Sequence, residues 1–209
     1  MNEKKHTIVI GITGGIGCGK SAVAEIIKNL GYQCLSTDDM AKELMNSSVE
    51  LKNNLIQEFG NDIYFPNGKL NIDILSYIVF GSGVEAHDKL LKLNQIVHPM
   101  VIDKMLEETD KLEAEGYSHI FIESALIYEA GLEDGFDFVI VIDTTEEIAI
   151  ERVLRKTSQT IEQIKNRMNE QISNEEKRKL ADFVINNNAT IEDLRQAVEF
   201  LLNIILSIN

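Results

Sequence analysis

The segment Gly14-Gly-Ile-Gly-Cys-Gly-Lys-Ser21 carries the clearest chemical signature of this 209-residue chain. It matches the pattern G-x-x-x-x-G-K-[ST], in which glycines let the backbone wrap closely so that successive N–H groups point at phosphate oxygens. The lysine adds a full positive charge near the β- and γ-phosphates, and the serine hydroxyl is a ligand for Mg²⁺. The segment therefore predicts a site for the phosphates of a nucleoside triphosphate.

The elements expected on either side of this loop are the ones that the motif requires. Residues 7–13 form a short apolar, β-branched run that is typical of a buried parallel strand. Residues 20–30 have the apolar period of a helix, whose N-terminus presents partial positive charge to the same anion. A second strand is expected at 34–36, which completes a βαβ unit and implies a parallel sheet.

The rest of the chain divides into a helical block and a return to α/β sequence. Helical patterns cover 39–45, 50–59, 72–80, 85–97, 100–115, 146–156, 160–170 and 191–206, and strand patterns cover 119–123, 138–143 and 183–185. Pro99 suits the first turn of a helix better than its interior, so two helices are expected around it. The closing helix is expected to pack on the sheet.

The composition argues against several classes of protein. A formal net charge of −14 argues against a broad nucleic-acid surface, which needs many Lys and Arg. No apolar stretch approaches the roughly 20 residues of a membrane-spanning helix, and the start lacks the pattern of a secretory signal. Cys18 and Cys34 have no metal-ligand spacing and are too few for a disulfide framework. We expect a cytoplasmic protein that contacts neither nucleic acid nor membrane.

Two further groups have the chemistry of phosphoryl transfer. Asp38 follows the second strand, where a carboxylate can orient an acceptor hydroxyl and take its proton; the alternative is a helix N-cap. Arg152 and Lys156 lie one turn apart on a helix, as expected of a mobile lid that neutralises charge; the alternative is a solvated face. Cys18 is either a small residue tolerated in the loop or a redox-sensitive thiol with a lowered pKa.

The chain resembles the dephospho-coenzyme A kinases from about residue 7 to residue 206. The segments that carry the resemblance are Ile12-Thr-Gly-Gly-Ile-Gly-Cys-Gly-Lys-Ser21, Asp38 with Ala41, Phe59-Gly60, Gly68-Lys-Leu70, His98-Pro99, Leu126-Ile-Tyr-Glu129, Arg152, Gln171 and Ala181-Asp-Phe-Val-Ile-Asn-Asn187. The resemblance implies transfer of the ATP γ-phosphate, with Mg²⁺, to the ribose 3′-hydroxyl of dephospho-coenzyme A. It also implies an α/β P-loop kinase core with a parallel sheet flanked by helices, a helical substrate-binding insertion and a helical lid.

The resemblance assigns these parts to residues. Within one kinase domain, 1–209, the nucleotide-binding core is 7–38, 117–151 and 181–209, the insertion is 39–116 and the lid is 152–180. The implied catalytic residues are Asp38, Lys20 and Arg152, and the implied substrate contacts are Asp38, His98 and Glu129. Nucleotide contacts are implied for Gly15, Ile16, Gly17, Cys18, Gly19, Lys20, Ser21, Ala22 and Asn187, and a metal contact for Ser21. For His98, a purely structural role is the alternative.

Several residues depart from the family pattern. They are Ser36, Ala22, Glu123, Ala125, Lys156 and the pair Asn71-Ile72. Two other functions therefore stay open: a P-loop kinase for another acceptor, such as a nucleoside monophosphate or small polyol, and a weakened, non-catalytic nucleotide-binding module. The chain is expected as a monomer or a weak homo-oligomer.

Overall fold

A computed structural model describes residues 7–81, 84–157 and 159–208 of the chain. Residues 1–6, on which the expectation about a secretory signal rests, lie outside this part. The chain forms two compact units, Met1–Leu35 with Leu112–Asn209, and Ser36–Lys111. The predicted core overlaps the first unit, and the predicted insertion overlaps the second. The predicted boundaries lie a few residues later in the chain than those of the units.

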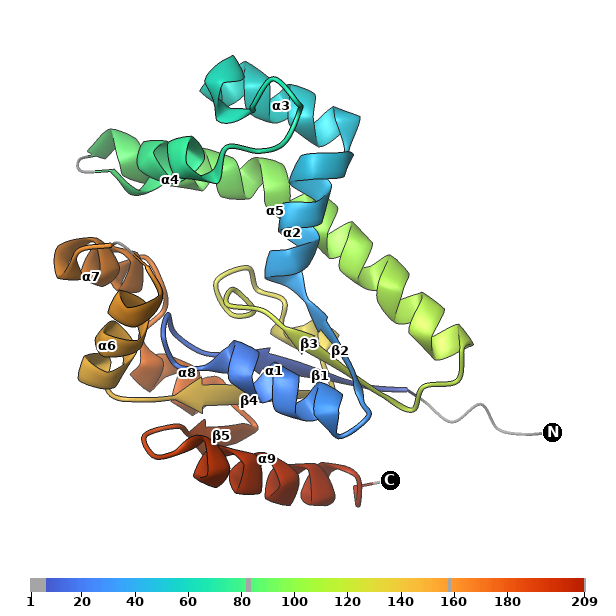
Figure 1. Cartoon of the computed structure of the whole chain (residues 1–209). Helices are drawn as coiled ribbons and strands as arrows, with labels where there is room; N and C mark the ends of the chain where they lie inside the picture. The colour runs from blue at the N-terminus through green and yellow to red at the C-terminus, as the bar shows by residue number, and fades with distance from the viewer. Residues whose placement is uncertain (1–6, 82–83, 158, 209) are drawn as a thin grey trace. The chain divides into compact units, whose positions relative to one another are not determined.

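The first unit is built on a five-stranded sheet (Figure 1). Its strands are β1 (Ile8–Thr13), β2 (Gln33–Ser36), β3 (His119–Glu123), β4 (Phe138–Asp143) and β5 (Phe183–Asn186). They lie in the order β2-β3-β1-β4-β5, and β1 pairs in parallel with both β3 and β4, as β4 does with β5. The predicted fold class is confirmed.

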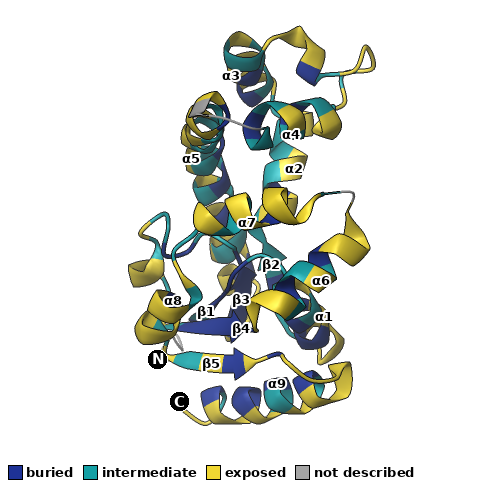
Figure 2. Cartoon of the chain, turned by 90° about the vertical axis from the view of Figure 1, so that its left-hand side faces the viewer, coloured by how far each residue is buried: buried dark blue, intermediate teal, exposed yellow. Residues whose placement is uncertain are grey.

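Among the described residues of this unit, one helix follows β1, three follow β4 and one follows β5. They are α1 (Lys20–Asn29), α6 (Glu146–Lys156), α7 (Ile161–Asn169), α8 (Asn174–Leu180) and α9 (Ile191–Ile205), with a short 3-10 turn, η2 (Glu133–Gly135). The central strands are buried, whereas the helices carry exposed outer faces (Figure 2).

Successive residues of β4 point to opposite faces of the sheet, as the pleat requires. Ile140 and Ile142 join the main core with residues of α1 and α9, so the predicted packing of the closing helix on the sheet is confirmed. Val139 and Val141 join a smaller cluster on the other face, with Ile127. A strand apolar on both faces is what the unbroken run of 138–143 predicts.

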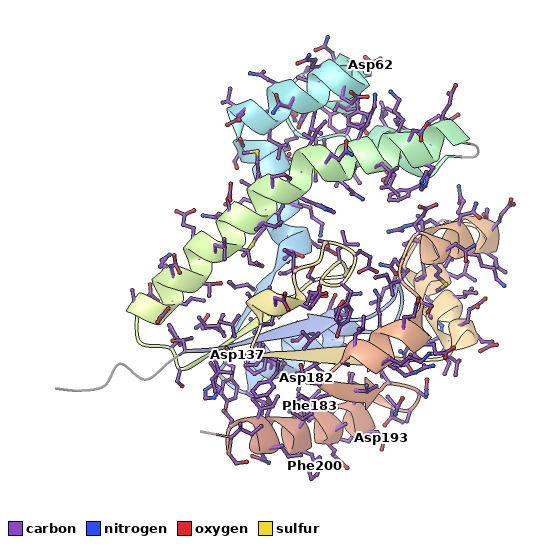
Figure 3. All side chains as sticks on the ribbon, turned by 180° about the vertical axis from the view of Figure 1, so that it is seen from behind. Asp62, Asp137, Asp182, Phe183, Asp193 and Phe200 are labelled. Carbon is purple, nitrogen blue, oxygen red and sulfur yellow. The ribbon has the colours of Figure 1, made fainter. Side chains whose placement is uncertain are left out.

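Two aspartates define where β4 and β5 begin. Asp137 Oδ2 accepts the Val9 N–H at 2.8 Å, and Asp182 Oδ2 accepts the Val139 N–H at 2.8 Å. Each aspartate opens the same tetrapeptide, Asp-Phe-Val-Ile, and the two lie at the same end of the sheet (Figure 3). Because these bonds tie each strand start to its neighbour, they hold the register that aligns the opposite, carboxyl ends of the strands.

The second unit is helical. It contains α2 (Thr37–Ser47), α3 (Val49–Phe59), η1 (Asn61–Ile63), α4 (Ile72–Phe80) and all but the last three residues of α5 (Val84–Ala114). Leu51, Leu55 and Ile63 are fully buried. Among the described residues, no helix of either unit is long and apolar enough to cross a membrane.

Pro99 lies inside one continuous helix, so the prediction of two helices around it is wrong. A proline in a helix interior removes the hydrogen bond to the carbonyl four residues earlier. Val97, Val101 and Met105 are buried at a spacing of four residues across the proline. Packing of this apolar stripe offsets the missing bond, which local propensity could not show.

Candidate active site

The phosphate loop, residues 14–21, joins the carboxyl end of β1 to the first turn of α1. Gly19 caps the helix with a φ of 97°, and Lys20 is the first helical residue. The Lys20 ammonium donates hydrogen bonds to the carbonyl oxygens of Gly14 and Gly15, at 2.9 and 3.2 Å. The lysine thus folds back over the loop, and its charge adds to that of the helix N-terminus.

The Ser21 hydroxyl donates a hydrogen bond to Glu123 Oε1 at 2.9 Å. Glu123 ends β3, is only 7% exposed, and is level with Ile12 in the register of β1 and β3. This longer carboxylate, which departs from the family pattern, therefore still reaches the loop. A hydroxyl and one carboxylate fit Mg²⁺, which keeps several waters and takes few protein ligands. Among the described residues, no group of three or more His, Cys, Asp or Glu side chains forms a metal site.

Asn187 and Arg152, both predicted site residues, meet at the loop. Asn187 Nδ2 donates to the Cys18 carbonyl oxygen at 2.8 Å, and Arg152 Nη2 donates to Asn187 Oδ1 at 3.4 Å. Arg152 Nη1 is buried and has no hydrogen-bond partner among the described residues; a Cβ on Gly19 would lie 3.8 Å from it. The guanidinium therefore keeps one donor for a bound anion next to the loop.

The Cys18 side chain is fully buried within the loop. Burial raises the pKa of its thiol, and the positive charge of Lys20 offsets this effect only in part. Asn174 Nδ2 lies 3.8 Å from the sulfur. The redox alternative requires a lowered pKa, so its physical premise is wrong for this loop. The neighbouring departure, Ala22, packs partly buried against the main core.

A pocket of about 640 Å³ adjoins the first half of the loop. The loop, the start of α6 and the α7–α8 connection line it. Within this lining, Gln171 Oε1 accepts the Ile16 N–H at 3.1 Å, and Arg178 Nη1 lies 2.6 Å from Asp143 Oδ2. The sequence indicates Gln171 only through the family resemblance. The sequence gives no signal for Arg178, because its contact with Asp143 depends on how the chain turns after α7.

Glu129, a predicted substrate contact, lies in the turn that follows β3. Its Oε1 is 2.7 Å from Lys177 Nζ and accepts the Ile172 N–H at 3.2 Å. Its Oε2 is buried without a hydrogen-bond partner among the described residues. The side chain is 13% exposed, and its partners belong to α8 and to the connection before it. A substrate contact for Glu129 stays a prediction.

Asp38 lies in the first turn of α2, in the second unit. The helix begins two residues before its predicted start because the Ser36 side chain accepts the Asp39 N–H, at 3.4 Å, and is the N-cap. The alternative in which Asp38 caps the helix is therefore wrong. Asp38 is exposed and follows β2 by two residues. Its role as a base stays a prediction.

His98 lies in α5, also in the second unit, and is partly buried. Burial lowers the pKa of its imidazole, so the neutral form is favoured. A substrate contact for His98 stays a prediction. In the first unit, Lys156 ends α6 and is exposed, while the nearby Arg155 pairs with Glu151 on the surface.

The fold and the loop together define a P-loop kinase. The phosphate loop follows β1, which is the central strand of the sheet, and an arginine of α6 reaches the same loop. A shikimate kinase structure from Acinetobacter baumannii shares this fold, with a TM-score of 0.57 and 13% identity over 97% of this chain and 95% of that one.

A family model described as dephospho-CoA kinase matches residues 8–193. A dephospho-CoA kinase from Listeria monocytogenes is 34% identical over 189 residues, which are 90% of this chain and 92% of that protein. The structure of a dephospho-CoA kinase from Campylobacter jejuni has a TM-score of 0.68 and 29% identity, covering 94% of this chain and 96% of that one. The chain belongs to the dephospho-CoA kinase family, ATP-dependent kinases of the final step of coenzyme A biosynthesis.

Proposed function

We propose that this chain transfers the γ-phosphate of ATP to the ribose 3′-hydroxyl of dephospho-CoA, giving CoA and ADP. The contact of 2.9 Å between the Ser21 hydroxyl and the Glu123 carboxylate carries the proposal. It joins a carboxylate to the hydroxyl that follows Lys20 in the loop, and a lysine, a hydroxyl and a carboxylate are groups that a Mg²⁺-bound triphosphate needs. Membership of the family supports dephospho-CoA as the acceptor.

The donor half of the site consists of the loop and the residues that contact it. In the proposal, residues 15–22 bind the triphosphate through backbone N–H groups other than that of Ile16, which Gln171 accepts, and Lys20 exchanges its loop carbonyls for phosphate oxygens. Arg152 Nη1 donates to the phosphates, and Asn187 holds the base end of the nucleotide. Ser21 and Glu123 would hold Mg²⁺, which would supply positive charge to offset that of the phosphates.

The acceptor half of the site rests on predictions from the sequence. Asp38 orients the 3′-hydroxyl and takes its proton, a role that an exposed carboxylate can serve. His98 and Glu129 contact the acceptor, and residues 152–180 act as a lid that excludes water. Phosphoryl transfer needs this exclusion because water is a competing acceptor.

The setting of the reaction is also part of the proposal. We expect a cytoplasmic protein, a monomer or a weak homo-oligomer, that acts on a small molecule and binds neither nucleic acid nor membrane. The net charge of −14 disfavours nucleic acid. Both cysteines are free and buried, which suits a reducing compartment.

A direct assay tests the acceptor. The protein is incubated with Mg-ATP and either dephospho-CoA or a panel of nucleoside monophosphates and sugars, and ADP release is followed. Turnover with dephospho-CoA alone is expected. Turnover only with another acceptor supports a different P-loop kinase, and ATP binding without turnover supports the non-catalytic module.

The neighbouring aspartates provide a matched test of the base. Asp38→Asn is expected to lower kcat by about 10²-fold or more, on the scale of general-base catalysis, while ATP binding persists. Asp39→Asn is the control, since this carboxylate is also exposed and pairs with Lys42 at 3.1 Å on the helix surface. Near-normal turnover of the Asp38 variant, or equal losses in both variants, contradicts the role of Asp38.

A further inference from the structure

Lys177 is the only lysine among the described residues that is fully buried. It lies in α8, a mostly charged helix, and its ammonium is 2.7 Å from Glu129 Oε1 and 3.4 Å from the Ala125 carbonyl oxygen. Burying an ammonium is costly, and a buried ion pair gives no assured gain in stability over apolar side chains. The position of Lys177 therefore suggests a role other than stability.

The carboxylate that Lys177 binds also holds the α7–α8 connection. Glu129 Oε1 accepts the Ile172 N–H at 3.2 Å, and the next residue toward α7, Gln171, accepts the Ile16 N–H of the phosphate loop at 3.1 Å. The ion pair is thus one residue away from a direct contact with the loop.

The other side of the ion pair leads back to the same loop. Ala125 and Glu129 belong to the turn after β3, and β3 ends at Glu123, which accepts the Ser21 hydroxyl. The first part of the loop is therefore held through Gln171, and its last residue through Glu123. Lys177 joins the two segments that provide these contacts.

We propose that the Lys177–Glu129 ion pair is a positioning pair for the phosphate loop, which acts on ATP binding through Ile172 and Gln171. By fixing the Ile172 amide, the pair holds the Gln171 side chain on Ile16, and this keeps the loop open for the phosphates before they arrive. Preorganisation of this kind raises affinity because the loop does not have to be ordered on binding. The inference rests on the proposed function, since it concerns the nucleotide half of the same site.

The double variant Lys177→Met/Glu129→Leu separates positioning from stability. It removes both charges together, so no buried charge is left unpaired, and its melting temperature is expected to stay close to that of the wild type. The Ile172 N–H loses its acceptor, and the dissociation constant of a non-hydrolysable ATP analogue is expected to rise about tenfold, the effect of one lost hydrogen bond. Lys177→Met/Glu129→Gln keeps an acceptor for Ile172 and is expected to restore most of the affinity.

Two further variants complete the test. Lys179→Met lies on the same helix but removes only an exposed pair with Glu175, 2.8 Å apart, and is expected to bind the analogue normally. In a Gln171→Ala background, the tenfold effect of the double variant is expected to shrink to about twofold, because the pair acts through Gln171.

Analogue binding, measured by titration calorimetry, uses no acceptor. If dephospho-CoA is not the acceptor, only the turnover assay is affected. If the ion pair does not position the loop, the dissociation constants of the analogue show it. Unchanged or tighter binding by a folded Lys177→Met/Glu129→Leu variant overturns the proposal, as does an equal effect with and without Gln171. If that variant does not fold, normal analogue binding by Gln171→Ala alone overturns it.

Discussion

Gly17 lies in the middle of the phosphate loop, against the backbone of α6. Its φ is +78°, and a Cβ at this position would be 2.4 Å from the carbonyl oxygen of Ala149 and 2.9 Å from its Cα. Since Cβ atoms hardly ever approach other heavy atoms closer than 3.0 Å, Gly17→Ala must separate the loop from α6 by at least about 0.6 Å. Both obstructing atoms belong to the main chain, so no change of rotamer relieves the contact.

Gly31→Ala provides the matched control. Gly31 follows α1 and has a similar φ of +93°, but a Cβ there would have nothing within 4 Å. An L-residue in this left-handed region costs about 1–2 kcal/mol. The control therefore carries the conformational cost alone, whereas Gly17→Ala adds a displacement at the site.

We expect Gly17→Ala to lower kcat/KM for ATP by about 10²-fold, because a misplacement approaching 1 Å has effects of this size. Gly31→Ala should lower the melting temperature but leave kcat/KM within about twofold of the wild type. Initial rates of ADP release at varied ATP, with thermal melts of both variants, measure the two effects. If kcat/KM of Gly17→Ala stays within about threefold of wild type, close packing of the loop on α6 does not position the phosphates.

Three further substitutions test the packing away from the loop. Pro99→Ala should restore a hydrogen bond to the Gln95 carbonyl and stabilise the protein by about 1–2 kcal/mol, seen as a higher melting temperature; no gain contradicts the cost assigned to the proline. Asp182→Ala should cost about 1–3 kcal/mol in denaturant unfolding, because the buried Val139 N–H loses its acceptor, while kcat is unchanged. Burial lowers the pKa of His98 below its usual 6.5 in the folded protein. As the pH falls, the imidazole is therefore protonated in the unfolded chain before it is protonated in the folded one, and the free energy of unfolding decreases. His98→Gln should remove this contribution, so the melting temperature should fall less between about pH 7.5 and 5.5 than in the wild type. If the melting temperature of the variant falls by the same amount, His98 is not a buried neutral imidazole.

Local patterns predicted most of the elements well. The bounds of α4 and α6 agree with the sequence to the residue, as do those of β3 and β4. Each of these segments has a clear apolar period or an unbroken apolar run, which depends only on neighbours in the chain. Where the apolar period was interrupted by a proline, as in α5, the same local rules divided a helix that tertiary packing keeps whole.

The α7–α8 segment shows where local rules end. Helix α8 is seven residues long and has no apolar face, so the sequence predicted a helical lid over 152–180 but no separate helix at 174–180. Its buried residue is a lysine, a type that is normally exposed, and the Glu129 carboxylate and the Ala125 carbonyl oxygen make that burial tolerable. Neither the helix nor its partner can be inferred without the turn that follows β3.

The sequence by itself determined the chemistry of the phosphate loop and the parallel strands that present it. Glycine positions, a lysine at the start of a helix and an apolar strand before it act over a few residues, so they can be interpreted directly. Only the tertiary structure decided which distant groups complete the site: Ser21 meets Glu123 across 102 residues, and Cys18 meets Asn187 across 169. These contacts follow from sheet order and strand register, which bring the carboxyl ends of separate strands to one edge, and a linear sequence does not contain that edge.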